Sequence, residues 1–168
     1  MSTFAYVNTY AHSVTHVTEK LLLSLKEIIR ESGLSPERLT DQWGNLHRGI
    51  RTWLNSQHLE TVILEVFDSG TDALVGRWDF DIFYSSTGEG GLWVDTDDIK
   101  YHILKSGRWP SQCDYRVVVT NKSGRPDVVG WSQCEFRSTE GFVRQSLGTT
   151  IGGNEYVSST ASYWRKVQ

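Results

Sequence analysis

The sequence predicts an α+β domain in which three helices pack on one face of a mostly antiparallel sheet. Three observations predict it. Apolar residues recur at steps of three and four from Val14 to Leu54, which is the period of amphipathic helices. The period changes to two from Thr61 onward, as expected for strands. The length of 168 residues suits one well-buried domain, so residues 1–168 are predicted to form a single unit.

Two helices are expected after a short, extended N-terminus. The first has its buried stripe at Val14, Val17, Leu21, Leu25 and Ile28. Gly33 ends it, in the position that a left-handed cap requires. Ser35 begins the second helix as N-cap, with Pro36 at the first helical position. The buried stripe of this second helix is Leu39, Trp43, Leu46, Ile50 and Leu54.

A hairpin, a third helix and two more strands follow. The hairpin strands are Val62–Phe67 and Leu74–Tyr84, with a turn at 68–72. After a glycine-rich loop at 88–91, Asp95 begins a helix whose acidic first turn includes Asp98. Its apolar face is Ile99, Ile103 and Leu104, and it is expected to end at Gly107 and Pro110. The next predicted strands are Cys113–Thr120 and Val128–Phe136, with a turn at 123–126.

The last thirty residues form strands readily but offer little apolar surface for a core. Phe142–Ile151 and Tyr156–Trp164 are extended runs on either side of Gly152 and Gly153. Their Thr, Val and aromatic residues favour a pleated backbone, whereas the many Ser, Thr and Gly residues leave little apolar area to bury. A weakly anchored strand can detach and pair elsewhere. The tail is therefore predicted to be a mobile clasp.

Two segments resemble the HORMA domain family of peptide-clasping switch proteins. The run Val75–Ile82, V-G-R-W-D-F-D-I, is similar to the R-W-x-F-D-I central strand of that family. The tail from Ser138 to Gln168 is similar to its safety belt, which closes over a bound peptide. The order of helices and strands fits across nearly the whole chain. The sequence most resembles the bacterial HORMA proteins encoded beside cGAS-like nucleotidyltransferases in CBASS anti-phage systems.

The resemblance implies a HORMA-like fold with a core of residues 1–137 and a safety belt of about 138–168. It implies that a closure-motif peptide adds to the strand 128–136, and that the belt docks on the opposite edge, beside Cys113–Thr120. The implied peptide-binding residues are Val129, Trp131, Gln133, Glu135, Val143, Gln145, Leu147, Thr149, Ile151, Tyr163 and Trp164. The implied hinges are Gly148, Gly152 and Gly153, since glycine reaches unusual backbone angles at little steric cost.

The resemblance also implies partners. The closed, peptide-bound form is expected to bind and activate a cGAS/DncV-like nucleotidyltransferase, which makes a cyclic oligonucleotide signal. An AAA+ ATPase is expected to reset the protein by engaging its N-terminal segment, Met1 to about Tyr10. The expected location is the cytoplasm, because Met1 to His12 lacks the basic and apolar regions of a secretory signal.

Candidate catalytic groups are few, and a structural role explains each of them. Asp79 and Asp81 lie two apart on one strand face beside Arg77, a spacing that can hold Mg²⁺ for phosphoryl transfer. Neither a phosphate cradle nor a third acid accompanies them, so a half-solvated strand face is the favoured interpretation. His12, His16 and Glu19 are likewise interpreted as a solvated helix face. We therefore expect no catalytic residue, metal ligand or cofactor.

Composition limits the remaining choices. A formal net charge of −3 without a basic stripe argues against nucleic-acid binding. No apolar stretch reaches the roughly 20 residues of a membrane helix. The two cysteines, Cys113 and Cys134, are expected to be small buried side chains in a reducing cytosol. Two alternatives to the switch adaptor stay open: a constitutive protein-interaction module, and a small metal-dependent phosphotransfer enzyme using Asp79 and Asp81.

Overall fold

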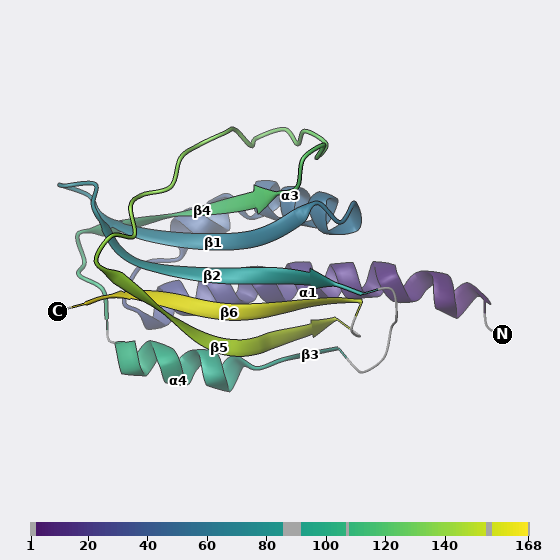
Figure 1. Cartoon of the computed structure of the whole chain (residues 1–168), viewed down its shortest axis with the longest axis horizontal. Coiled ribbons are helices and arrows are strands. Elements are labelled where there is room, and N and C mark those ends of the chain that lie inside the picture. Colours follow the sequence, from purple (N-terminus) through teal and green to yellow (C-terminus); the bar gives the residue numbers. More distant parts are fainter. Residues whose placement is uncertain (1–2, 86–91, 107, 154–155, 168) are drawn as a thin grey trace.

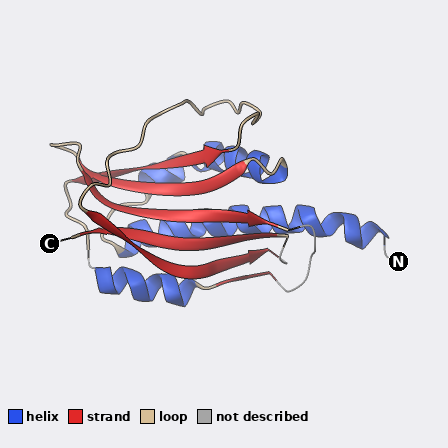
Figure 2. Ribbon diagram, viewed as in Figure 1, coloured by secondary structure: helices blue, strands red, loops and turns tan. Residues whose placement is uncertain are grey.

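A six-stranded antiparallel sheet forms the centre of the structure, a computed structural model that describes residues 3–85, 92–106, 108–153 and 156–167. The strand order is β3-β5-β6-β2-β1-β4. The strands are β1 (Leu59–Asp68), β2 (Leu74–Tyr84), β3 (Leu92–Val94), β4 (Cys113–Asn121), β5 (Phe142–Gly153) and β6 (Val157–Lys166). Helices α1 (Thr3–Glu31) and α3 (Trp43–Asn55) cover one face of this sheet, as Figures 1 and 2 show. The predicted α+β fold class is confirmed.

Helix α1 is longer than the sequence suggested. It begins at Thr3, so the expected extended N-terminus is wrong from that residue onward. Its predicted stripe is confirmed, because Val14, Val17, Leu21, Leu25 and Ile28 are all buried. The predicted glycine cap is also confirmed: Gly33 has a φ of +93°, and the amide of Leu34 donates to the carbonyl of Ile29 at 3.0 Å.

The expected second helix is two helices. The short α2 (Glu37–Asp41) and α3 meet at Gln42, whose φ of −96° and ψ of 5° interrupt the helical path. Leu39, Leu46, Ile50 and Leu54 are buried as predicted, whereas Trp43 is only half-buried. The side chain of Gln42 makes no capping hydrogen bond and is exposed. The Gln42 side chain therefore forms part of the exposed surface where α2 and α3 meet.

Helix α4 (Thr96–Ser106) lies against α1 and β5. Its predicted start is confirmed, because the Asp95 carboxylate accepts the amide of Asp98 at 3.0 Å. Ile99 and Ile103 are buried, but Leu104 is 79% exposed. The placement of Leu104 on the apolar face is wrong because it lies about 100° around the helix from Ile103. The loop predicted at 88–91 and the stop predicted at Gly107 lie outside the described residues.

The hairpin of β1 and β2 matches the prediction. Its turn is held by the Asp68 carboxylate, which accepts the amides of Gly70 at 2.8 Å and Thr71 at 3.0 Å. β4 is confirmed and pairs with β1 over its length. The strand expected at 128–136 is wrong, since these residues form an irregular segment.

The C-terminal hairpin, β5 with β6, belongs to the sheet and to the core. β6 pairs with β2 from Arg77 opposite Trp164 to Tyr84 opposite Val157. The expectation that this tail adds little to the core is wrong, because its inward side chains are buried: Ile151, Val157, Ala161 and Tyr163. Alternation along β6 places Tyr163 opposite Trp78 and Ala161 opposite Phe80 of β2. No helix in the described parts of the chain is long and apolar enough to cross a bilayer.

Candidate functional site

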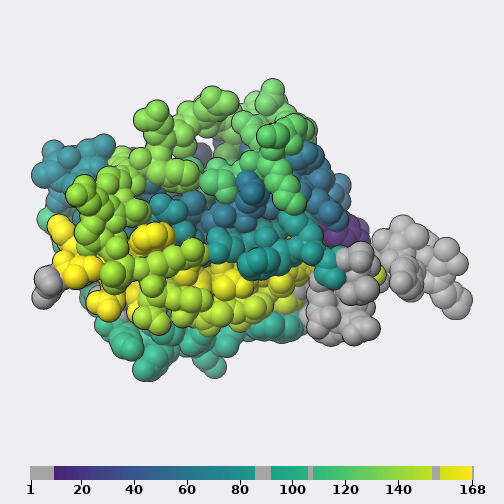
Figure 3. All heavy atoms as spheres, in the orientation of Figure 1, coloured from purple at the N-terminus to yellow at the C-terminus, as the bar shows by residue number. Residues whose placement is uncertain are grey.

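The sheet edge formed by β4 is bridged by a long segment. β4 pairs with β1 on one side, and no described strand pairs with its other side. Residues 122–141, which we call the crossing segment, leave the end of β4, run outside this edge and return to the sheet at β5 (Figure 1). In the space-filling view the crossing segment forms the upper rim, with a hollow below it (Figure 3). An unpaired strand edge offers backbone hydrogen bonds to an added strand.

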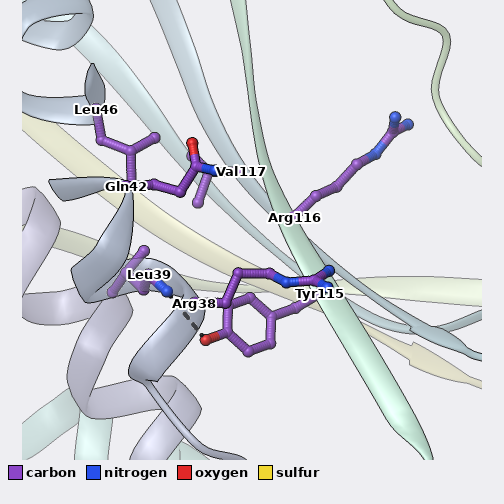
Figure 4. Close-up of a pocket in the computed structure, with 7 residues that line it drawn as sticks. All are labelled: Arg38, Leu39, Gln42, Leu46, Tyr115, Arg116 and Val117. Carbon is purple, nitrogen blue, oxygen red and sulfur yellow. Dashed lines mark hydrogen bonds between the residues drawn. The ribbon is translucent and has the colours of Figure 1, made fainter. Parts of the chain in front are cut away.

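A pocket of about 410 Å³ lies between β4 and the two helices α2 and α3 (Figure 4). Its lining residues are Arg38, Leu39, Gln42, Leu46, Tyr115, Arg116 and Val117. Leu39 and Leu46 are buried and supply an apolar floor. The Tyr115 hydroxyl donates to the carbonyl of Ser35 at 2.7 Å and accepts the amide of Leu39 at 3.2 Å. These bonds join α2 to β4, and burial raises the pKa of the Tyr115 phenol.

The pocket continues into a more polar one toward the start of β4. This second pocket, of about 540 Å³, shares Arg38, Gln42 and Tyr115 with the first. The Arg38 side chain, which is largely exposed, pairs with the Asp114 carboxylate at 2.5 Å. The result is one groove along the first half of β4, apolar near Leu46 and charged near Asp114.

The first half of the crossing segment is bound to α3. The Trp53 indole donates to the carbonyl of Pro126 at 2.7 Å, and the Trp131 indole donates to the carbonyl of Asn45 at 2.9 Å. The two indoles meet edge to face, with ring centroids 5.0 Å apart. Arg48 adds a bond to the carbonyl of Val129 at 3.2 Å. We call this set of contacts the α3 anchor.

The second half is bound to β1 through a buried carboxylate. Glu65, which is fully buried, accepts the backbone amide of Arg137 at 2.9 Å and its guanidinium at 2.9 Å. Arg137 also reaches the Asp72 carboxylate at 2.6 Å and lies 3.6 Å from the centre of the Phe67 ring. Burial opposes the charge of Arg137, but Asp72 and Glu65 outweigh it and raise the pKa. Arg116 pairs with Glu65 at 2.6 Å and also donates to the carbonyl of Glu135. These contacts form the Glu65 anchor.

One guanidinium joins the crossing segment to the C-terminal hairpin. The Arg77 guanidinium on β2 lies 5.1 Å from the ring centre of Phe136 and 5.3 Å from that of Trp164. Asp79 holds Arg77 in place with a contact of 2.7 Å and accepts the Trp164 indole at 3.1 Å. The end of the crossing segment and the docked hairpin therefore depend on the same group.

The segment predicted to be the receiving edge strand, 128–136, is not a strand of the sheet. The edge is β4 and not 128–136, because Gly130, with a φ of +94°, and the seating of Trp131 on α3 divert that segment from the sheet. The expected docking of the belt beside Cys113–Thr120 is also wrong. The C-terminal hairpin docks on β2, and both β2 and β1 lie between it and β4.

The structure separates the predicted peptide-binding residues into two groups. Those on the crossing segment, beyond the edge of β4, are Val129, Trp131, Gln133 and Glu135. Those on the C-terminal hairpin are Val143, Gln145, Leu147, Thr149, Ile151, Tyr163 and Trp164, and of these Ile151 and Tyr163 are core residues. The groove residues of α2, α3 and β4 were not predicted from the sequence, because Leu39 and Leu46 were assigned only to the core. Tyr115, an aromatic residue on a predicted strand, is the residue that could have indicated the groove.

The predicted hinges differ in their surroundings. Gly148 has a φ of +80° at a register shift in β5, and its missing Cβ would meet open space. Gly152 lies opposite Trp93 of β3, and a Cβ there would come within 2.0 Å of the indole nitrogen. Gly153 pairs with Val157 at the end of β5. A hinge role stays a prediction for all three.

The other candidate groups have structural partners. Asp79 is bound as described above, and Asp81 pairs with Arg144 at 2.7 Å. His16 contacts the carbonyl of Trp93 at 3.1 Å, and the described residues contain no cluster of three potential metal ligands. Both cysteines are free thiols. Cys113 is half-buried, and burial raises the pKa of its thiol; Cys134 is exposed on the crossing segment, so its expected burial is wrong.

Comparisons with solved structures match this architecture. A chain of a mitotic checkpoint complex superposes with a TM-score of 0.76 at 12% identity, covering 93% of this chain and 99% of that one. C. elegans HTP-2 bound to HTP-3 closure motif 1 gives 0.69 at 11%, covering 95% and 88%. The E. coli MS115-1 CdnC:HORMA-deltaN complex gives 0.55 at 12%, covering 95% and 90%.

The comparison with curated proteins gave no match. At the level of families, residues 1–167 match the model described as Bacterial HORMA domain 2, which spans all the described elements. The chain belongs to this bacterial HORMA domain family.

Proposed function

We propose that the chain is a switch adaptor that captures a closure-motif peptide as an added strand on β4, beneath the crossing segment. The observation that carries the proposal is the groove between α2 and β4, next to an unpaired edge that the crossing segment bridges. Backbone hydrogen bonds to β4 supply affinity, and alternate side chains of the peptide enter the groove. The C. elegans HTP-2 structure, whose protein is bound to a closure motif, supports the assignment by its shared fold.

The two anchors make capture durable. The crossing segment is tied to α3 at one end and to Glu65 at the other, so a peptide beneath it leaves only when one anchor opens. Local opening of a bonded segment is a slow and rare event compared with side-chain motion. Peptide release is therefore slow without assistance. In this proposal the safety belt comprises the crossing segment together with the C-terminal hairpin.

Filling the groove is expected to block capture. Gln42→Trp places an indole between α2 and β4, and the fold should be kept because the Gln42 side chain is exposed and makes no capping bond. The probe is a peptide selected from a random display library against the wild-type chain, and we expect its affinity to fall about 30-fold or more through lost strand bonds and pocket contact. Lys105→Trp on the exposed side of α4 is the control and should bind normally. Unchanged binding to Gln42→Trp would contradict the proposed site.

The C-terminal hairpin is proposed to be the detachable part of the switch. Its core-facing side carries Thr150 and Ser159, both fully buried, and their hydroxyls have no hydrogen-bond partner among the described atoms. A buried unpaired hydroxyl costs about 1–3 kcal/mol. The hairpin therefore docks less firmly than an aliphatic strand of the same shape.

Removing one such hydroxyl is expected to stabilise the docked hairpin. Thr150→Val keeps the shape and should raise the unfolding free energy by about 1 kcal/mol, measured by urea denaturation. Hydrogen exchange of β5 and β6 should slow in parallel. Thr149→Val is the matched control, because the neighbouring Thr149 is exposed and faces Thr160. Equal effects of the two substitutions would show that the buried hydroxyl carries no penalty.

The closed form is further proposed to bind and activate a cGAS-like nucleotidyltransferase, with an AAA+ ATPase resetting it. The solved E. coli complex of a HORMA protein with CdnC supports the first partner. The second is proposed from the family resemblance. In both roles the chain acts as an adaptor in the cytoplasm, while the nucleotidyltransferase makes the signal of the anti-phage system.

Deleting residues 1–9 tests the reset step. Tyr10 must be kept, because its hydroxyl donates to the carbonyl of Leu54 at 2.9 Å and its ring packs on Tyr156. We expect the deletion to leave capture of the selected peptide intact and to slow ATP-driven release at least tenfold, since a remodelling enzyme needs a terminal handle. The measurement is the rate of peptide release from the chain in the presence of ATP and the proposed AAA+ partner. Release at the normal rate would place the handle elsewhere.

A constitutive interaction module is the second candidate. The observation that favours it is the burial of Tyr163, Ile151 and Val157, which fixes the C-terminal hairpin in the core. Hydrogen exchange separates the two functions. A switch exchanges β5 and β6 by a local opening of lower free energy than global unfolding, whereas a constitutive module exchanges them only with the whole fold.

A further inference from the structure

A glycine on α3, Gly49, lies directly against the Trp131 indole of the crossing segment. Gly49 is buried in the middle of this helix, and a Cβ there would come within 2.3 Å of the Trp131 indole nitrogen and 2.4 Å of an indole ring carbon. Contacts under 3 Å are not tolerated between such atoms, so the indole fits only because position 49 has no side chain. Glycine in a helix interior lowers helix stability, which makes its presence here informative.

Gly130, the residue before Trp131, also lies close to α3. Gly130 has a φ of +94°, in the left-handed region, and a Cβ there would meet the Asn45 side chain at 3.2 Å. Asn45 lies one helical turn before Gly49, and its carbonyl accepts the Trp131 indole proton at 2.9 Å. Two glycines therefore bring the backbone of the crossing segment and the helix together around one indole.

The seat lies where it controls access to the groove. Residues 126–131 are bound to α3, and residues 135–137 to the Glu65 anchor. The exposed residues between them, 132–134, connect the α3 anchor to the Glu65 anchor outside the edge of β4. If Trp131 leaves its seat, the crossing segment is held from one end only.

We propose that Gly49 is a positioning residue for closure of the crossing segment: because it has no side chain, it leaves a site on α3, which we call the seat, where the Trp131 indole packs. The inference rests on the proposed capture of a peptide on β4, but its test uses the free protein. The seat sets how firmly the crossing segment is held at its α3 end. It does not contact the peptide groove, whose α3 residue is Leu46.

The first test is Gly49→Ala, followed by hydrogen exchange with mass spectrometry. We expect exchange of residues 126–134 to accelerate about tenfold or more, because the methyl group displaces the indole and the bonds around it open. Exchange in β1 and β2 should stay slow. Gly44→Ala is the matched control, since Gly44 is on the same helix and a Cβ there would meet nothing within 4 Å. Equal exchange of the two variants in residues 126–134 would overturn the proposal.

The second test removes the indole and asks whether the effect of Gly49→Ala changes sign. In the wild-type chain, Gly49→Ala should lower the urea midpoint. In a Trp131→Ala chain it should raise the midpoint, because only the better helix propensity of alanine remains. Failure of Gly49→Ala alone to fold, with a folded Gly49→Ala/Trp131→Ala chain, supports the seat. A lowered midpoint, or failure to fold, in both backgrounds overturns it.

The selected peptide then separates this inference from the proposed function. With both correct, Gly49→Ala releases the peptide about tenfold faster than Gly44→Ala does, since a segment held from one end opens more often. If the crossing segment opens in Gly49→Ala while peptide release stays unchanged, the seat stands and capture beneath the segment is contradicted. If exchange in the segment is unchanged, the seat fails, whatever the peptide does.

Discussion

Replacing Tyr163 by alanine is expected to destabilise the whole protein by about 3–4 kcal/mol, the loss typical of a buried aromatic side chain. Tyr163 is 4% exposed, and its ring stacks on Trp78 with centroids 5.3 Å apart. The His102 ring packs beside it at 5.6 Å. Truncation creates a cavity at the contact between the C-terminal hairpin and β2, which the neighbouring rings cannot fill without moving.

The measurement is urea denaturation of the variant against the wild type. Tyr101→Ala on α4 is the control, because Tyr101 is 59% exposed and its loss should cost less than about 0.5 kcal/mol. A small effect at Tyr163, confined to faster exchange of β5 and β6, would show that the hairpin is a loose clasp and not a part of the core.

Replacing Glu65 by glutamine is expected to cost about 2–3 kcal/mol and to open the second half of the crossing segment. The carboxylate is fully buried and serves Arg116 and Arg137, whose side chains are 33% and 17% exposed. Removing one partner of a buried ion pair leaves an uncompensated charge, which costs 3–5 kcal/mol when the site is dry. The partial exposure of the two guanidinium groups places the expected value just below that range.

Urea denaturation measures the global cost, and trypsin cleavage after Arg137 measures the local one. We expect the Glu65→Gln chain to be cut at this site much faster than the wild type, because its bonds to Glu65 no longer hold the backbone. Asp127→Asn is the control. It alters a surface pair with Arg125 whose aspartate is fully exposed, so stability and cleavage after Arg137 should both be unchanged. Resistance of the Glu65→Gln chain to trypsin would show that the segment is held without this anchor.

Local sequence patterns predicted the elements well. Steps of three and four identified the buried stripes of α1 and α3, and the alternation of Trp78 and Phe80 identified β2. The helix caps were also predicted, since Gly33 ends α1 and Asp95 caps the start of α4 as expected. These features depend on neighbours in the sequence, which is why they could be predicted.

Long-range pairing could not be predicted in this way. The Ser- and Thr-rich run 157–162 was assigned to a mobile tail, but each alternate residue faces the core because β6 lies between β5 and β2. The reverse error occurred at 128–136, where strand-forming residues are drawn away from the sheet by Trp131 and Gly49. Both outcomes depend on partners about 80 residues away, Asp79 for Trp164 and Asn45 for Trp131.

Some features of the candidate site were predicted from the sequence, but their positions were not. A sheet edge, a covering segment and exposed aromatic residues were all expected. The groove itself was not, because it arises where α2 breaks from α3 at Gln42 and where the Tyr115 hydroxyl ties α2 to β4. A helix break and a tertiary hydrogen bond leave no periodic signal in the sequence.

The two anchors of the crossing segment differ in chemistry. The α3 anchor depends on an aromatic seat and bonds to helix carbonyls, whereas the Glu65 anchor depends on charge. Arg77 connects the second anchor to the C-terminal hairpin through Phe136 and Trp164. Undocking the hairpin is therefore expected to weaken the hold on the crossing segment at its Glu65 end.

Hydrogen exchange of the wild-type chain with and without the display-selected peptide shows whether a peptide adds to β4 beneath the crossing segment. We expect new protection in β4, residues 113–121, and in the crossing segment, residues 122–141. We expect no new protection at β3, the other edge of the sheet. Protection that falls on β3 and β5, with β4 unchanged, would show that the peptide does not add to β4.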